Sequence, residues 1–225
     1  MPIFNSKKAI FVRVPKTASK SMHVSLNNAG ETGGAGPIHE KMITIKDRIR
    51  KDMYEEYFKF AFVRNPWDWF LSWITYKQTL PKHTARNFDF NKWLEEIDEI
   101  RTVRGGNYWK PGIDFVFYKP DDTPVGCSFG SCRAKTRGEC ICLVRDQQHH
   151  FICDKDKNLM VDFVGRFESI KDDWSYITSK LNIESELVHI NKSNHKSYRE
   201  VYTDKTAEIV YNLFKEDIDM FGYEF

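Results

Sequence analysis

The sequence has almost no net charge, because its 34 Lys and Arg residues are nearly matched by 32 Asp and Glu, which leaves +2 over 225 residues. A protein that binds nucleic acid along its phosphates usually has a clear excess of basic residues. The near balance argues against a nucleic-acid partner. Any binding of an anion must therefore come from a local group of basic side chains.

Long apolar runs are also missing, and none approaches the ~20 residues that cross a bilayer. Nothing near Met1 resembles a signal peptide, so we expect no membrane partner and a cytoplasmic location. No internal repeat is detectable. With 41% hydrophobic and 15% aromatic residues, the chain has enough apolar material for one core, and we expect a single domain over residues 1–225.

Glycine is absent from the first polar loop, PKTASKSM (Pro15–Met22), which follows the apolar run Ala9–Val14. This order predicts a strand that turns into a helix, and a helix N-terminus offers unpaired N–H donors and partial positive charge. Lys16, Lys20 and three hydroxyl residues add to that preference for an anion. The P-loop that binds nucleoside triphosphates needs GxxxxGK[ST]. The loop therefore indicates an anionic ligand other than ATP.

A second strand, basic corner and helix follow in FKFAFVRNPWDWFLSWITYK (Phe58–Lys77). Trp67 begins an i, i+3, i+4, i+7 apolar stripe, which predicts a buried helical face, and Ser72 falls on the opposite face. Arg64 and Ser72 could thus reach one ligand. Trp67 is expected in the core, whereas Trp69 and Trp109 could lie in the core or stack on a ligand.

Strand and helix patterns alternate along the chain. Strands are expected at 9–14, 59–63 and 159–164, and helices at 19–29, 44–57, 67–79, 90–101, 170–181 and 204–220. This alternation predicts an α/β fold with a parallel sheet that helices cover on both faces.

The two loop segments resemble those of sulfotransferases that use 3′-phosphoadenosine 5′-phosphosulfate, specifically the carbohydrate branch with heparan sulfate 2-O-sulfotransferases and bacterial and viral relatives. That family has PKTxSxS and FxRxPxxRxxS where this chain has PKTASKS and FVRNPWDWFLS. Lys20 replaces a common hydroxyl residue, and Trp69 replaces a usual basic residue. The resemblance covers about residues 9–76 and 144–225 and leaves out a cysteine-containing insertion at about 101–143.

The resemblance implies a P-loop-like sheet of the sulfotransferase fold and an enzyme that transfers a sulfuryl group from 3′-phosphoadenosine 5′-phosphosulfate to a hydroxyl acceptor, expected to be a carbohydrate. Adenosine 3′,5′-bisphosphate would be the product, and no catalytic metal is expected. The cofactor-binding residues would be Lys16, Thr17, Ala18, Ser19, Lys20, Ser21 and Met22 for the 5′ end, Arg64 and Ser72 for the 3′-phosphate, and additionally Arg166, Lys192 and Ser193.

Two catalytic roles follow from what sulfuryl transfer requires. Lys16 would stabilise the negative charge that develops on the leaving oxygen. His39 is preferred as the base because imidazole accepts a proton near neutrality, and neighbouring Glu40 is an alternative. His195 and Tyr198, in NKSNHKSY, could close over the acceptor. Arg166 either contacts the ligand or pairs with Glu168.

Four of the five cysteines, Cys127, Cys132, Cys140 and Cys142, lie close together in the insertion. Their CxxxxC and CxC spacings differ from the paired CxxC of a common zinc ribbon. Either a structural zinc site or free cysteines fits this pattern, and disulfides are disfavoured in a reducing cytoplasm.

Two other functions stay open at this point. A kinase-like phosphotransferase with a P-loop would require magnesium, and the glycine-free loop disfavours it. A noncatalytic module could bind a phosphonucleotide or a sulfated glycan through the same loops without a working base.

Overall fold

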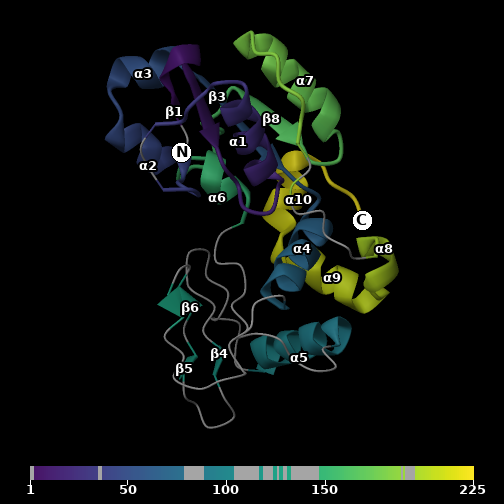
Figure 1. Ribbon diagram of the computed structural model, residues 1–225. Coiled ribbons are helices and arrows are strands. Elements are labelled where there is room, and N and C mark those ends of the chain that lie inside the picture. Colours follow the sequence, from purple (N-terminus) through teal and green to yellow (C-terminus); the bar gives the residue numbers. More distant parts are fainter. Residues whose placement is uncertain are drawn as a thin grey trace. The chain divides into compact units, whose positions relative to one another are not determined.

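The computed structural model describes residues 3–34, 37–78, 89–103, 117–118, 124–125, 127–128, 131–132, 147–188, 190 and 196–225 (Figure 1). The chain forms two compact units. Unit 1 contains Met1–Asn65 and Gln148–Ser193, and unit 2 contains Pro66–Gln147 and Asn194–Phe225. Each unit is thus built from two separate stretches of sequence, while the single domain over residues 1–225 stays a prediction.

Unit 1 contains a four-stranded sheet in the order β1-β2-β3-β8. The strands are β1 (Ile3–Phe4), β2 (Ala9–Val12), β3 (Phe58–Val63) and β8 (Phe163–Arg166). β2, β3 and β8 are parallel, whereas the short edge strand β1 runs antiparallel to β2. The predicted α/β class is confirmed, with a mixed sheet in place of an entirely parallel one.

Both faces of this sheet are covered, as the alternation predicts. The helices of unit 1 are α1 (Ser19–Asn28), α2 (Met42–Arg48), α3 (Lys51–Glu56), α6 (His149–Ile152) and α7 (Ile170–Leu181). α1 and α7 pack with Phe11, Phe60 and Phe62 in one core. Side chains alternate along a strand, and on the opposite face Ile10 and Ala61 are also fully buried.

The register of β2 and β3 brings two loops to one edge of the sheet. Phe11 is paired with Phe60, and their rings stack with centroids 4.8 Å apart. Val12, the last residue of β2, is opposite Ala61, two residues before the end of β3. Because the strands are parallel, the residues that follow each of them emerge on the same side of the sheet.

Unit 2 is mainly helical. It contains α4 (Pro66–Gln78), α5 (Phe90–Val103), α8 (Tyr198–Val201), α9 (Asp204–Leu213) and α10 (Lys215–Phe221). Trp67 is in the core, as predicted, and its Nε1 donates to the Ala207 carbonyl at 2.8 Å. Trp69 is also in the core, where it packs edge-to-face against Phe214. Ser72 is only 3% exposed, so α4 is buried beyond its apolar stripe.

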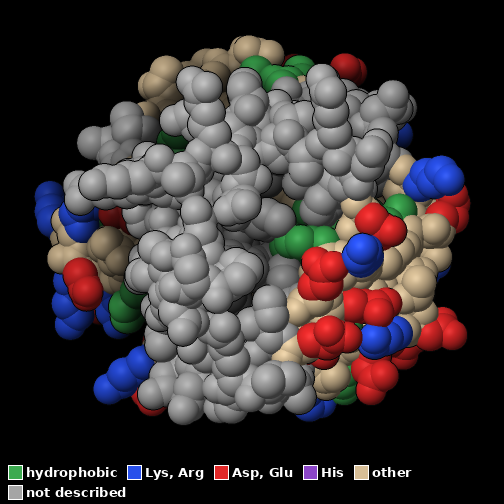
Figure 2. All heavy atoms as spheres, turned by 90° about the horizontal axis from the view of Figure 1, so that it is seen from below, with side chains coloured by type: hydrophobic (Ala, Val, Ile, Leu, Met, Phe, Trp, Pro, Cys, Tyr) green, Lys and Arg blue, Asp and Glu red, His purple; other side chains and the backbone are tan. Residues whose placement is uncertain are grey.

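Acidic side chains gather on part of the molecular surface, as Figure 2 shows in the view from below. α5 alone carries Glu95, Glu96, Asp98 and Glu99, and Lys205 of α9 donates to Glu95 at 2.7 Å. Although the net charge of the chain is small, α5 therefore carries a local excess of negative charge.

The insertion contributes four two-residue strands, β4 (Phe117–Tyr118), β5 (Pro124–Val125), β6 (Cys127–Ser128) and β7 (Ser131–Cys132). β6 and β7 are antiparallel, with Cys127 opposite Cys132. Cys140 and Cys142 lie outside the described residues, so the zinc site stays a prediction. Among the described helices, none has the length and apolarity that a bilayer crossing would require.

Candidate functional site

The loop after β2 has a strained backbone that suits an anion. Lys16 and Ala18 have φ values of 63° and 58°, in the left-handed region that usually requires glycine. This conformation costs roughly 1–2 kcal/mol per residue. Left-handed residues next to ordinary ones turn successive N–H groups toward one concavity, which binds anions. α1 begins directly afterwards at Ser19 and adds the N–H groups of its first turn.

Two of the loop hydroxyls already donate within the protein. Thr17 Oγ1 donates to the Val14 carbonyl at 2.9 Å, and Ser21 Oγ donates to the Ile190 carbonyl at 3.3 Å. Ser21 also accepts the Ile190 N–H at 3.2 Å. Donors for a ligand would thus come mainly from backbone N–H groups and from Lys16, while Lys20 is exposed on the first turn of α1.

Met22 does not fit its expected place in the loop. Its side chain is fully buried in the core of unit 1, and its N–H donates to the Ala18 carbonyl at 3.2 Å. Both groups are used by the fold because α1 has already begun. Met22 therefore belongs to the core, and we leave it out of the proposed site.

Arg64 joins the loop, although it lies 48 residues away in the sequence. Its Nη1 donates to the Lys16 carbonyl at 3.2 Å, and its guanidinium stacks over the Phe167 ring, 4.1 Å from the centroid. Burial and then the Arg64 charge lower the pKa of Lys16 to about 8. A buried guanidinium and a half-buried ammonium thus lie near one another at the carboxyl edge of the sheet, where a ligand with several negative charges would be stabilised.

The backbone of this corner is held by two side chains that the sequence reasoning did not select for this task. Gln148 Oε1 accepts the Arg64 N–H, and Gln148 Nε2 donates to the Arg64 carbonyl, both at 2.8 Å. Glu168 accepts the next N–H, that of Asn65, at 2.6 Å. No local pattern marks Gln148, since its partner is 84 residues away.

The hydrogen bond and the burial of His39 favour a ring that can accept a proton at Nε2. Its Nδ1 lies 2.7 Å from the Arg13 carbonyl. A carbonyl oxygen can only accept, so Nδ1 carries the proton and Nε2 keeps its lone pair. Burial lowers the pKa of His39, and the nearby Arg13 charge lowers it further against the opposing effect of the carbonyl hydrogen bond. His39 is therefore neutral near pH 7.

Glu40 is occupied as an ion-pair partner. It is buried, and its two carboxylate oxygens accept from Arg48 of α2, from Nε at 3.0 Å and from Nη2 at 2.6 Å. This pair anchors the segment that carries His39 to α2. The arrangement favours His39 over Glu40 as the base.

Arg13 is a cation that the sequence reasoning missed. It is only 6% exposed, and its buried Nε has no hydrogen-bond partner within the described part of the chain. Burial lowers the pKa of this guanidinium. A buried guanidinium whose Nε has no partner among the described residues is costly, so Arg13 adds to the preference of this edge for anions. Its signal in the sequence is its position directly after the apolar residues of β2.

The remaining predicted site residues lie in other segments of the chain than the Lys16 loop and Arg64. Arg166 ends β8 in unit 1, where it is exposed and its N–H donates to Asp173 at 2.7 Å. Ser72 in α4 and Tyr198 in α8 belong to unit 2, where the Tyr198 ring packs edge-to-face against Phe225. Their roles stay predictions. Lys192, Ser193 and His195 lie outside the described residues.

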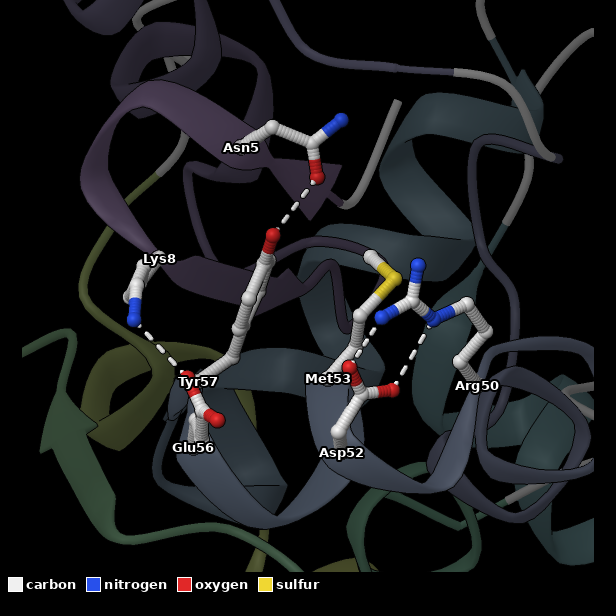
Figure 3. A pocket seen from close by; sticks show the side chains of 7 residues that line it. All are labelled: Asn5, Lys8, Arg50, Asp52, Met53, Glu56 and Tyr57. Atoms are coloured by element: carbon white, nitrogen blue, oxygen red, sulfur yellow. Dashed lines mark hydrogen bonds and ion pairs between the residues drawn. The ribbon is translucent and has the colours of Figure 1, made fainter.

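A pocket of about 300 Å³ lies elsewhere on unit 1 (Figure 3). Its polar groups pair with one another. Lys8 donates to Glu56 at 2.8 Å, Arg50 pairs with Asp52, and the Tyr57 hydroxyl donates to the Asn5 side chain at 3.0 Å (Figure 3). Lys8 and Tyr57 precede β2 and β3, so the pocket is at the opposite edge of the sheet from the Lys16 loop. These satisfied pairs offer no cationic group comparable to Lys16 and Arg64.

Comparison with known proteins supplies one match. The model of the sulfotransferase family matches residues 128–224, which is less than half of the chain. No curated protein and no solved structure matches significantly. The matched region includes Gln148, Arg166 and Glu168 but neither the Lys16 loop nor Arg64. The α/β architecture of unit 1 is consistent with the sulfotransferase fold, and the resemblance to the sulfotransferase family is confirmed by the match over residues 128–224.

Proposed function

We propose that this protein is a sulfotransferase that uses 3′-phosphoadenosine 5′-phosphosulfate as its donor. The observation that carries the proposal is the contact between the Arg64 guanidinium and the Lys16 carbonyl. It joins the segment that resembles a 5′-phosphosulfate loop to the segment that resembles a 3′-phosphate site. Sulfuryl transfer in general is supported by the family match, which lies in a separate part of the sequence.

The residues of this edge fit a donor with an anionic group at each end. The N–H groups of the left-handed loop and the Lys16 ammonium suit the 5′-phosphosulfate. The Arg64 guanidinium, which is planar and already oriented by Phe167, suits the 3′-phosphate. A role for Ser72, which belongs to unit 2, rests on the resemblance alone. Thr17, Ala18, Ser19, Lys20 and Ser21 would shape the loop. The Thr17 hydroxyl fixes its backbone at Val14, whereas the Ser21 hydroxyl bonds the backbone of Ile190.

The reaction assigns separate tasks to Lys16 and His39. The donor supplies the sulfuryl group, and the acceptor hydroxyl forms a new S–O bond while the S–O bond to the 5′-phosphate breaks. His39 Nε2 accepts the hydroxyl proton. Lys16 and the loop N–H groups stabilise the electron pair left on the phosphate oxygen, a contribution of about 3–4 kcal/mol per well-placed donor in comparable sites.

His39 is held close to the loop through Arg13. The His39 ring is bonded to the Arg13 carbonyl, and Arg13 precedes Lys16 by three residues. Three virtual bonds of about 3.8 Å place the Cα atoms of Arg13 and Lys16 no more than about 11 Å apart. The His39 ring and the Lys16 loop are thus attached to the same short stretch of backbone, residues 13–16.

We further propose a carbohydrate as the acceptor, as the resemblance implies, and a cytoplasmic location. The sequences that would select the acceptor, including His195 and the insertion at about 101–143, lie mainly outside the described residues. A screen of sugar and non-sugar hydroxyl acceptors tests the first point, and cell fractionation tests the second.

The proposed function is tested by incubating the full chain with radiolabelled donor and a panel of hydroxyl acceptors, with and without a chelator. Transfer of label that persists in the chelator supports a sulfotransferase. A parallel reaction with radiolabelled ATP tests the alternative. Transfer of its label that requires magnesium would support the phosphotransferase instead. Tight binding of the bisphosphate without transfer to any acceptor would support a noncatalytic module.

A further inference from the structure

The corner that carries Arg64 begins where the sheet ladder ends. Val63 is the last residue of β3 and is paired with Arg166 of β8. Beyond it, the Arg64 N–H and carbonyl and the Asn65 N–H have left the ladder. Buried backbone groups require partners, and Arg64 and Asn65 are each only 5% exposed. The partners that the fold provides therefore decide how this corner is oriented.

Gln148 supplies two of those partners from one planar amide. It is fully buried, and it bonds both the N–H and the carbonyl of Arg64 at 2.8 Å. Bonds to both groups of one residue fix the peptide planes on either side of its Cα. They thereby fix the direction in which the Arg64 side chain leaves the backbone.

The other side of the corner is fixed by the end of β8. Glu168 accepts the Asn65 N–H at 2.6 Å. Phe167 donates its N–H to the Val63 carbonyl at 2.8 Å, and its ring lies under the guanidinium of Arg64. Gln148 thus holds the Arg64 backbone and the direction of its side chain, while Glu168 holds the next N–H. Phe167 holds the guanidinium plane.

We infer that Gln148 is a positioning residue for the 3′-phosphate site, acting through the backbone of Arg64. This inference rests on the proposed function, in which Arg64 binds the 3′-phosphate of the nucleotide. Gln148 itself does not touch the ligand. Its loss would misdirect the guanidinium, whereas a glutamine that only fills space would affect stability alone.

The test measures two affinities by calorimetry, for adenosine 3′,5′-bisphosphate and for adenosine 5′-phosphate. Their ratio isolates the contribution of the 3′-phosphate. Gln148→Met keeps the approximate volume but removes both hydrogen bonds, and we expect the ratio to fall by about tenfold or more, toward that of Arg64→Ala. Affinity for the 5′-phosphate alone should change by less than about threefold.

Gln147→Met is the matched control. Gln147 is the preceding residue, and its Nε2 also donates to a backbone carbonyl, that of Leu213 at 3.0 Å. The variant removes a comparable hydrogen bond from a neighbouring glutamine that does not hold Arg64. We expect a loss of thermal stability with the affinity ratio unchanged.

A double-mutant cycle separates action through Arg64 from a direct effect. In Arg64→Ala, adding Gln148→Met should not lower the ratio further, because the group that Gln148 positions is gone. Gln148→Glu, which keeps an acceptor for the Arg64 N–H but no donor for its carbonyl, should give an intermediate ratio. It also serves as the second variant if Gln148→Met does not fold.

Two results would overturn the inference in distinguishable ways. If folded Gln148→Met and Gln148→Glu keep the wild-type ratio while Arg64→Ala loses it, Gln148 is merely structural and the proposed function stands. If the wild type itself shows no preference for the 3′-phosphate, the 3′ site fails, and the role of Gln148 fails with it.

Discussion

Lys16 combines three features that a surface lysine does not have. Its backbone is left-handed, its carbonyl accepts from Arg64, and its pKa is lowered to about 8, chiefly by burial. The first and the third cost stability in the free protein, because backbone strain and a desolvated charge both oppose folding. A bound anion would offset the cost of the charge. The residue is thus arranged for a ligand at the expense of the unliganded fold.

The pKa of Lys16 predicts how nucleotide binding depends on pH. Lys16 is protonated in the free protein below about pH 8, and an anion favours the protonated form. Affinity for adenosine 3′,5′-bisphosphate should therefore decrease as the pH rises through 8, by about tenfold between pH 7.5 and 9.5. In Lys16→Arg the guanidinium stays charged, so its calorimetric profile should be flat over this range. Parallel profiles would exclude Lys16 from the site.

Removing the Lys16 charge should weaken nucleotide binding but raise the free energy of unfolding of the unliganded protein. In the unfolded chain the pKa of Lys16 returns toward the usual 10.5, so between about pH 8 and 10.5 the unfolded state binds more protons than the folded state. Below about pH 8 Lys16 is charged in both states, and the cost of desolvating that charge opposes folding. Lys16→Met should raise the free energy of unfolding at pH 7 by about 1 kcal/mol. Urea denaturation without nucleotide measures it. A clear decrease would mean that the charge is stabilised within the fold.

His39→Ala should lower turnover by about 10²–10⁴-fold while leaving the bisphosphate affinity close to that of the wild type. Because burial lowers the pKa of His39, the acidic limb of kcat/KM should lie below the usual histidine value of about 6.5. Steady-state kinetics from pH 5 to 8 check both points. An active His39→Ala, together with an inactive Glu40→Gln, would transfer the role of base to Glu40.

At the scale of elements, the sequence predicts helices better than it predicts where they break. The apolar period places α7 at its observed bounds, 170–181, and α1 within one residue of its end. The helix expected at 44–57 is instead two, α2 and α3, because Ile49 and Arg50 are extended. The helix expected at 204–220 is divided near Phe214 into α9 and α10. In both cases the apolar pattern continues across the break, so periodicity cannot locate it.

The sequence predicts the strands less completely than the helices. β2 and β3 follow from their apolar runs, but β8 begins at Phe163, four residues later than expected, because Leu159 forms an isolated bridge with Cys153. β1 has only two residues, Ile3–Phe4. Such a strand exists through its pairing with β2, and a pair so short has no sequence pattern of its own.

The serine face of α1 suggests a prediction about a neighbouring segment. Ser25 Oγ accepts the Val188 N–H at 2.9 Å, and Ser185 Oγ donates to the Ser25 carbonyl at 2.9 Å. Ser25→Ala removes the acceptor of Val188 and should lower the free energy of unfolding by about 1–2 kcal/mol. The exposed Ser175→Ala of α7 is the control and should change it by less than about 0.5 kcal/mol. Equal effects in urea denaturation would show that α1 does not hold this segment through Ser25.

At the scale of the whole molecule, the net charge does not reveal where charged side chains are concentrated. A net charge of +2 predicts nothing about the acidic helix α5, about the buried cations Arg13 and Arg64, or about the half-buried Lys16. Lys16 and Arg64 could be selected from their motifs. Arg13 belongs to no such motif, and its position after an apolar strand does not by itself reveal that its side chain is buried.

Long-range contacts limit what the sequence reveals of the site. Gln148 and Glu168 bond the Arg64–Asn65 corner from 84 and 103 residues away. A single sequence marks the groups that meet a ligand when they fall in a recognisable spacing. It does not mark groups that hold such residues in place, because any amide or carboxylate at the right point of the fold could do so.

The central claim is that the Lys16 loop and Arg64 bind a nucleotide with a 3′-phosphate, and thermal unfolding with two ligands tests it most directly. A ligand at 100 times its Kd adds about 2.7 kcal/mol, or roughly 5–10 °C for a chain of this size. We predict such a shift with adenosine 3′,5′-bisphosphate, in the presence of a chelator, and none with magnesium ATP. A shift with magnesium ATP alone, or with neither ligand, would contradict the claim.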